Sequence, residues 1–163
     1  MSLLDLCQWL QDGSISTALR ESTTLWPVLE GSHLIGMALM MAPVMMYDFR
    51  LIGVRWKRDP VSKVKWGFLP ITFFGFTLMV VTGVLLLWSE PVKCYKSGYF
   101  RIKVIALILA GLNALVFHST IDRTTSQWDM SLPPPFRARM AGILSLTLWT
   151  AVIFAGRYTA YNL

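Results

Sequence analysis

Four long apolar stretches constrain the fold of this chain more than any other feature. The first occupies residues 24–53, and its central part, 34–47, holds no charged side chain. At ~1.5 Å per residue, a helix over the whole stretch would be ~45 Å long, enough to cross the ~30 Å hydrocarbon layer of a bilayer. Further stretches of spanning length lie at about 66–88, 99–120 and 136–161. The sequence therefore predicts an all-α membrane protein, in which four transmembrane helices form an up-down-up-down bundle and a single domain.

The composition agrees with a membrane setting. Of the 163 residues, 55% are hydrophobic and only 15% are charged, whereas about a quarter are charged in soluble domains. The net charge is +6, and the basic residues flank the apolar stretches, as is typical of membrane proteins. No basic stripe with interleaved aromatic residues indicates a nucleic-acid partner. We therefore expect the lipid bilayer to surround this chain.

The segment before the first stretch is amphipathic. Leu3, Leu6, Cys7 and Leu10 have the i, i+3, i+4, i+7 spacing of one helical face. A helix over residues 2–12 is too short to span, so we expect it to lie in the membrane interface. It has no basic n-region and no small-residue cleavage site, which argues against a removable signal peptide.

The two cysteines, Cys7 and Cys94, are far apart and belong to no CxxC motif. This pattern argues against a disulfide framework and against a zinc site. A single bridge between the two thiols is left open.

Basic residues indicate the orientation. The side facing residues 54–65 and 121–139 would hold nine lysines and arginines, and the other side six. Because cytoplasmic loops carry the excess of Lys and Arg, both termini are expected on the periplasmic side of the inner membrane.

Short motifs follow one another in a characteristic order after residue 25. They are Trp26-Pro27, Glu30, His33, Asp48-Phe49-Arg50-Leu51-Ile52-Gly53, Gly75-Phe76, Thr82-Gly83, Phe100 with Lys103, Asn113 with Phe117-His118, Ser145-Leu146 with Trp149, and Gly156-Arg157 with Tyr161. Their order resembles a family of small bacterial four-helix inner-membrane proteins of undefined role, similar in layout to the membrane subunits of b-type cytochromes. The resemblance implies the four-helix architecture and brings no established activity.

Histidines within membrane helices are candidates for function, because ionisable groups are costly there. Two imidazoles could clamp a b-type haem, but His33 and His118 are expected at different depths. His33 lies outward of the first helix's midpoint, whereas His118 lies beyond the midpoint of the third helix, toward the cytoplasm. At ~1.5 Å per residue the two are separated by ~20 Å along the membrane normal. A single bis-histidine haem is therefore disfavoured.

Other cofactor arrangements stay open. His118 could bind haem together with Met45 or Met46, since histidine–methionine ligation is known for haem. His33 alone could hold a five-coordinate haem, with Arg157 or Lys103 near the propionates.

The alternative interpretations of the same residues are structural. His33 would bond Glu30 or a neighbouring helix, and His118 would face the interface. Asn113 would bond another helix or contact a quinone carbonyl.

A second constellation consists of His33, Met37, Met41 and Met45, spaced four residues apart. Imidazole and thioethers suit Cu(I), so the row could handle copper. Because i+4 positions drift by ~40° around a helix, only two or three of them share a face. Packing is the favoured interpretation, since methionine fills irregular gaps.

Charged residues at the helix ends could pair across the bundle. We expect Glu30 to pair with Arg157 on the outer side, and Asp48 with Arg137 or Arg139 on the inner side. Each pair would neutralise groups that are costly near hydrocarbon.

No nucleophile–base pair, carboxylate dyad or phosphate-binding glycine loop occurs, so an enzyme acting alone is not expected. The favoured function is a small accessory or redox subunit of a larger membrane complex, linked to b-haem or quinone electron transfer. The alternatives are a structural or assembly subunit without cofactor and a Cu(I)-handling membrane protein. Other membrane subunits are the expected protein partners.

Overall fold

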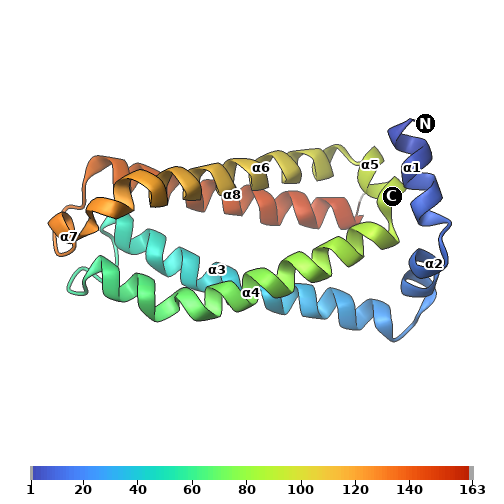
Figure 1. The fold of residues 1–163 in the computed structure, drawn as a ribbon, viewed down its shortest axis with the longest axis horizontal. Coiled ribbons are helices and arrows are strands. Elements are labelled where there is room, and N and C mark those ends of the chain that lie inside the picture. Colours follow the sequence, from blue (N-terminus) through green and yellow to red (C-terminus); the bar gives the residue numbers. More distant parts are fainter. Residues whose placement is uncertain (1, 162–163) are drawn as a thin grey trace.

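The computed structural model describes residues 2–161, which form helices joined by short connections (Figure 1). The helices are α1 (Leu3–Gln11), α2 (Ser14–Glu21), α3 (Leu25–Ile52), α4 (Val61–Ser89), α5 (Pro91–Lys96), α6 (Gly98–Val116), a π-helical turn η1 (Phe117–Ile121), a 3-10 turn η2 (Asp122–Thr124), α7 (Thr125–Trp128) and α8 (Phe136–Tyr161). Four are long and apolar enough to cross a membrane: α3, α4, α6 with its continuation to Trp128, and α8. The prediction of an all-α, four-helix, multi-pass membrane protein is confirmed.

The structure contains helical turns that the sequence pattern did not indicate. α2 lies between the predicted helix over residues 2–12 and the first span, where no helix was predicted, and its buried Ser16 donates a hydrogen bond to the Ser89 carbonyl at 2.9 Å. α4 begins at Val61 rather than near residue 66, because Val61 is fully buried and its amide bonds the Asp129 carbonyl at 3.1 Å. Both differences come from contacts with distant segments.

The long helices form two pairs. α3 packs along α4, α6 packs along α8, and the pairs meet through α3 and α8, whereas α4 and α6 barely touch. The expected up-down-up-down order holds along the chain, but the bundle is split between its pairs (Figure 1). One end, called the termini end, holds α1, α2, α5 and both chain ends; the other, called the loop end, holds α7 and residues 53–60.

Glycines set the close helix contacts. A Cβ on Gly75 of α4 would lie 2.6 Å from the Met40 amide nitrogen, and one on Gly36 would lie 2.9 Å from that of Met79. The backbones of α3 and α4 therefore touch where these helices cross. Gly142 has the same role between α8 and α3, because its Cβ would lie 3.1 Å from the Asp48 carbonyl oxygen.

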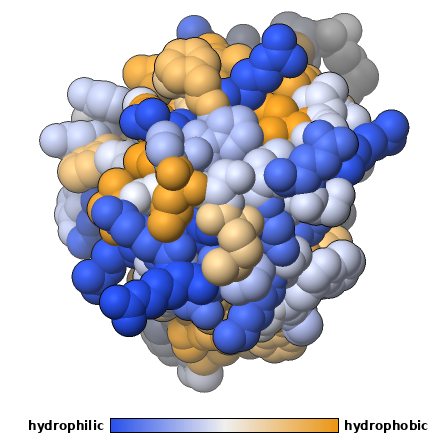
Figure 2. Space-filling view, turned by 90° about the vertical axis from the view of Figure 1, so that its left-hand side faces the viewer, coloured by the Kyte–Doolittle hydropathy of each residue, from blue (hydrophilic) through white to orange (hydrophobic). Residues whose placement is uncertain are grey.

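A buried arginine fastens the loop end. Arg50 is fully buried; its Nε donates to the Asp59 carbonyl at 2.8 Å and its Nη2 to the Asp129 carbonyl at 3.0 Å. The Asp129 carboxylate accepts hydrogen bonds from the amide and hydroxyl of Ser62 at 2.8 and 2.7 Å. α3 ends at Ile52 and is capped by Gly53, whose φ of 84° is a left-handed conformation that suits glycine. Figure 2 shows the outer face of this end, where hydrophilic side chains gather.

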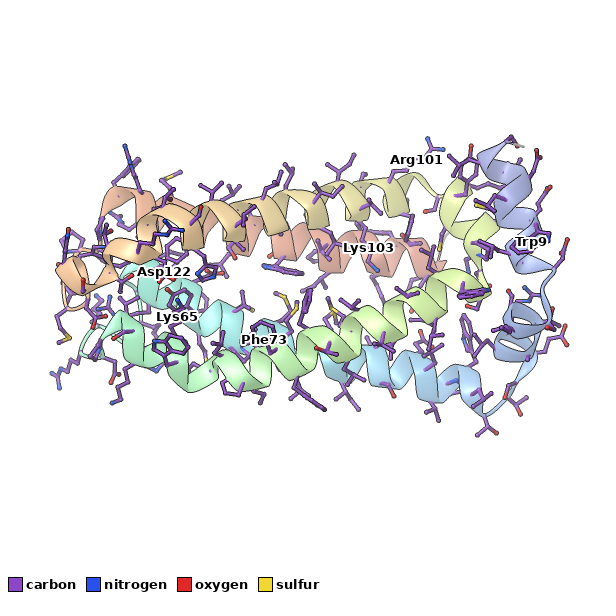
Figure 3. All side chains as sticks on the ribbon, viewed as in Figure 1. Trp9, Lys65, Phe73, Arg101, Lys103 and Asp122 are labelled. Carbon is purple, nitrogen blue, oxygen red and sulfur yellow. The ribbon has the colours of Figure 1, made fainter. Side chains whose placement is uncertain are left out.

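The termini end is covered by the short helices. α1 packs on α5, and α2 packs on α4 and α3. Ser2 caps α1 through a capping box with Asp5. Trp9 of α1 is exposed at this end (Figure 3), a position that suits the membrane interface.

Candidate functional site

A large cavity lies between the two helix pairs, where α4 and α6 separate. Its volume is about 1190 Å³, and its walls are mainly apolar side chains of all four long helices. This exceeds the ~300–1,000 Å³ typical of small-molecule sites. Phe73 and Val84 of α4 and Val104 of α6 line the cavity and are also 63%, 54% and 37% exposed. The cavity therefore opens between α4 and α6, toward the side where the hydrocarbon of a bilayer would lie.

His33 forms part of the cavity wall in the half nearer the termini end. Its Nδ1 lies 2.9 Å from the Thr82 hydroxyl of α4. That hydroxyl donates its own hydrogen to the Leu78 carbonyl at 2.6 Å. With its hydrogen on this carbonyl the hydroxyl can only accept from His33, and the neutral imidazole then carries its proton on Nδ1. The other ring nitrogen, Nε2, keeps its lone pair and bonds no residue in the described part of the chain.

The imidazole rests in a notch on α4. A Cβ on Gly83 would lie 3.1 Å from His33 Cε1 and 3.6 Å from its Nδ1. Any larger residue at position 83 would press on the ring. Thr82 and Gly83 together thus fix where the ring lies and which nitrogen is free.

Lys103 lies in the same half of the cavity, on the opposite helix pair. Its side chain runs along α8, with Nζ 3.5 Å from the position of a Gly156 Cβ. Figure 3 shows Lys103 between the helix pairs. Lys93 and Arg157 also line the cavity, and Lys93 forms an ion pair of 3.5 Å with Glu90. Glu30 and Glu90 also line this half, so three cations stand beside two carboxylates and one positive charge is in excess.

His118 lies at the loop end, in the π-helical turn η1. Its Nδ1 is 3.0 Å from Asp122 Oδ2, which also forms an ion pair with Lys65 (Figure 3). The side chain of His118 is 50% exposed. His33 and His118 therefore lie in opposite halves of the bundle, and the structure does not bring them to one level.

The methionine row is only partly gathered. Met37 and Met41 line the cavity with His33, but Met45 is 38% exposed and lies outside its wall, as does Met46. Within residues 2–161, no three His, Cys, Asp or Glu side chains are placed to hold a metal ion. Neither a continuous thioether ladder nor a His118–methionine pair is assembled.

The expected cross-bundle ion pairs are not formed among the described residues. Arg157 bonds the Tyr161 hydroxyl and lies 4.5 Å from that ring. It does not pair with Glu30, because α3 and α8 separate toward the termini end (Figure 1). Asp48 is only 4% exposed and faces the cavity, while Arg137 and Arg139 are exposed on either side of buried Ala138.

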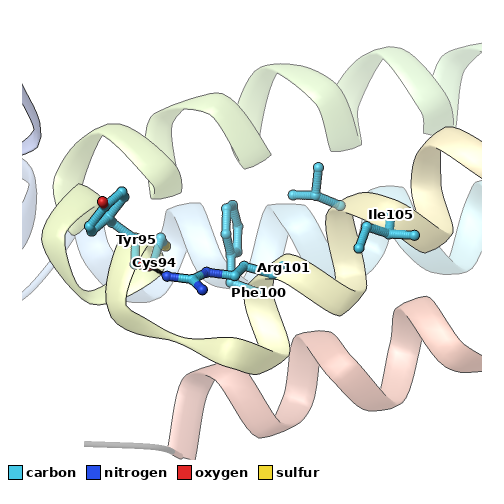
Figure 4. A pocket seen from close by; sticks show the side chains of 6 residues that line it. Cys94, Tyr95, Phe100, Arg101 and Ile105 are labelled. Carbon is cyan, nitrogen blue, oxygen red and sulfur yellow. Dashed lines mark hydrogen bonds between the residues drawn. The ribbon is translucent and has the colours of Figure 1, made fainter. Parts of the chain in front are cut away.

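Two other residues of interest have defined surroundings. Asn113 donates to the Ala141 carbonyl of α8 at 3.0 Å, so the predicted bond to another helix is formed. Cys7 and Cys94 are both free thiols. Cys94 borders a small pocket of about 350 Å³ with Phe100 and Arg101 (Figure 4), and burial raises the pKa of its thiol.

Sequence reasoning did not single out the partners that make this site. Thr82 and Gly83 stood only as a short motif, and nothing indicated that they hold His33. A hydroxyl and a glycine on one helix, paired with a lone histidine on the adjacent helix, would have been the signal.

Comparison of the chain with family models, with curated proteins and with solved structures found no match. Several residues of the short sequence motifs line the cavity wall, among them Trp26, His33, Lys103, Ser145 and Trp149. What the cavity can bind follows from its own geometry.

Proposed function

We propose that this protein is a small redox subunit of the bacterial inner membrane, which holds a b-type haem in the cavity between its helix pairs. His33 would hold the haem iron through Nε2. The observation that carries this proposal is the His33–Thr82 hydrogen bond of 2.9 Å, which leaves Nε2 free beside the cavity. The protein would act beside larger subunits of an electron-transfer complex.

The surroundings of His33 support ligation. Metal-bound histidines almost always donate their second ring N–H to an acceptor, which fixes the tautomer and the ring orientation. Thr82 is that acceptor, and its hydroxyl is itself held by the Leu78 carbonyl. Imidazole nitrogen is a common axial ligand of haem iron.

The charges around the cavity support a haem with its propionates toward the termini end. Lys103, Lys93 and Arg157 all line the cavity there. Ammonium and guanidinium groups bind carboxylates through charge-assisted hydrogen bonds. The macrocycle itself would lie against the apolar wall, out of water.

The proposed haem has one histidine ligand from this chain. His118 is engaged with Asp122 at the loop end, and the described part of the chain holds no other histidine. His33 is therefore the one imidazole that would hold the haem in this cavity.

The orientation proposed for the protein follows the basic residues. Arg50, Arg55, Lys57, Arg58, Lys63 and Lys65 all belong to the end of α3, the first loop and the start of α4. We place this loop end in the cytoplasm and the termini end, with the haem, toward the periplasm.

The experiment is an absorption spectrum of the purified protein, expressed with sufficient haem. A Soret band that is lost in His33→Ala and kept in His118→Ala supports the proposal. The second variant is the matched control, because it removes the only other imidazole. A protein without a Soret band that co-purifies with partner subunits would favour the assembly role instead, and copper lost on Met37→Leu and Met41→Leu would favour copper handling.

A further inference from the structure

The loop half of the cavity contains polar atoms that the protein leaves without partners. Tyr47 and Asp48 both line the cavity, and neither the Tyr47 hydroxyl nor Asp48 Oδ2 has a hydrogen-bond partner among residues 2–161. Asp48 is 4% exposed. Buried polar groups in proteins are nearly always bonded, so an unpartnered carboxyl oxygen on a cavity wall points to a ligand.

The cations and the amide nearby are already engaged, apart from Arg50 Nη1, and the Ser145 hydroxyl of α8 lies within bonding reach of the Asp48 carboxyl, whose Oδ2 stays unpartnered. Lys65 pairs with Asp122, Arg50 bonds the carbonyls of Asp59 and Asp129, and the Asn113 amide donates to the Ala141 carbonyl. Rearrangement of a neighbouring cation would therefore break an existing contact. A ligand that brings its own donor satisfies Asp48 without such a loss.

The residues that line the cavity indicate the chemistry of the rest of that ligand. The cavity around Asp48 is lined by apolar residues such as Val44, Leu51 and Phe117. Its opening between α4 and α6 faces the hydrocarbon, past exposed Phe73 and Phe76. The ligand therefore enters from the bilayer and combines an apolar tail with a hydroxyl-bearing head.

We propose that the loop half of the cavity binds an isoprenoid hydroquinone, whose ring hydroxyl donates a hydrogen bond to Asp48. Tyr47 supplies a second polar group on the same wall. The choice of a hydroquinone over another hydroxylated lipid rests on the proposed redox function. The site is separate from that of the haem, because Asp48 follows His33 by fifteen residues on α3, about 22 Å along a helix at ~1.5 Å per residue.

The test measures equilibrium binding of a short-tailed hydroquinone and of the matching quinone to the protein in nanodiscs, with empty nanodiscs subtracted. The oxidised form lacks the donor hydrogen, so wild type should bind the hydroquinone at least tenfold more tightly. Asp48→Leu should abolish this preference, because leucine keeps the branching at Cγ but cannot accept a hydrogen bond. Asp59→Leu, which changes a carboxyl outside the cavity, should keep it.

Other outcomes overturn the proposal. Equal affinity of wild type for the two forms would do so, and so would an unchanged preference in a folded Asp48→Leu protein. Should Asp48→Leu fail to fold, Asp48→Asn is measured in its place and must weaken the preference. Lipids extracted from the purified protein should include the quinone, and phospholipid alone would contradict the assignment.

These results are independent of the haem. A protein that lacks a Soret band but prefers the hydroquinone overturns the haem proposal alone. A protein with a Soret band and no preference overturns the hydroquinone site alone.

Discussion

His33 of α3 and Thr82 of α4 are joined by a hydrogen bond of 2.9 Å between Nδ1 and Oγ1, across the helix pair that forms one wall of the cavity. Thr82 in turn donates to the Leu78 carbonyl of its own helix. This chain of two hydrogen bonds fixes one imidazole nitrogen and frees the other. The position of a single hydroxyl thus decides what His33 can do.

Thr82→Val should weaken haem binding while the fold persists. Valine has the shape of threonine but cannot accept the His33 proton, so the ring loses its fixed orientation. Loss of such a partner typically costs ~10–100-fold in metal affinity. Haem titration of the purified variant measures this. Thr77→Val is the control, since Thr77 is exposed and bonds only the Phe73 carbonyl of its own helix; an equal loss in both variants would contradict the role of Thr82.

Gly75→Ala should destabilise the protein, because the new methyl group would lie 2.6 Å from the Met40 amide nitrogen and would push α3 away from α4. Overpacking of this kind costs about 1–3 kcal/mol or more. Thermal unfolding in detergent is the measurement. Gly111→Ala, with no atom within 4 Å of the new Cβ, should leave the unfolding temperature unchanged or raise it. Equal unfolding temperatures for the two variants would argue against close contact of α3 and α4.

Arg50→Leu should be strongly destabilising. Arg50 is fully buried and bonds the carbonyls of Asp59 and Asp129, so leucine would leave both without a donor. Hydrogen bonds to charged groups contribute about 1.5–3 kcal/mol each. Arg55→Leu changes a guanidinium that lies 5.9 Å from the Trp56 ring in the loop, and it should have little effect. Similar unfolding free energies for the two variants would show that the loop end is not held by Arg50.

The thiol of Cys94 should react slowly near neutral pH. Burial raises its pKa, with Glu90 adding to the effect, so the protonated thiol persists to higher pH than in a free cysteine. Maleimide labelling of Cys94 in a Cys7→Ser background should reach its half-maximal rate above pH ~8.5, the ordinary cysteine value. A half-maximal rate at or below that pH would contradict the partial burial of Cys94 on α5.

The long helices could be predicted from the sequence because each is set by its own length and hydropathy. The first span was expected over residues 24–53 and is Leu25–Ile52. α2 and the first turn of α4 could not be predicted in the same way. Their stability depends on Ser16 and Val61 bonding the distant carbonyls of Ser89 and Asp129, which no local pattern reveals.

The cavity lay beyond sequence reasoning for a related reason. Helix periodicity describes one helix at a time, whereas the split of the bundle depends on which helices pair closely. Gly36 and Gly75 allow α3 and α4 to pack in close contact. α3 and α8 then separate toward the termini end (Figure 1). The expected contact between Glu30 and Arg157 is lost there, and His33 is left facing open space.

The most direct measurement of the central claim is whether added imidazole restores haem to His33→Gly. Free imidazole can enter the space left by the side chain and bind iron without a covalent link to α3. The account predicts that His33→Gly lacks the Soret band and regains it when imidazole is supplied with haem. A His33→Gly protein that keeps its full Soret band without imidazole would contradict the assignment of His33 as the axial ligand.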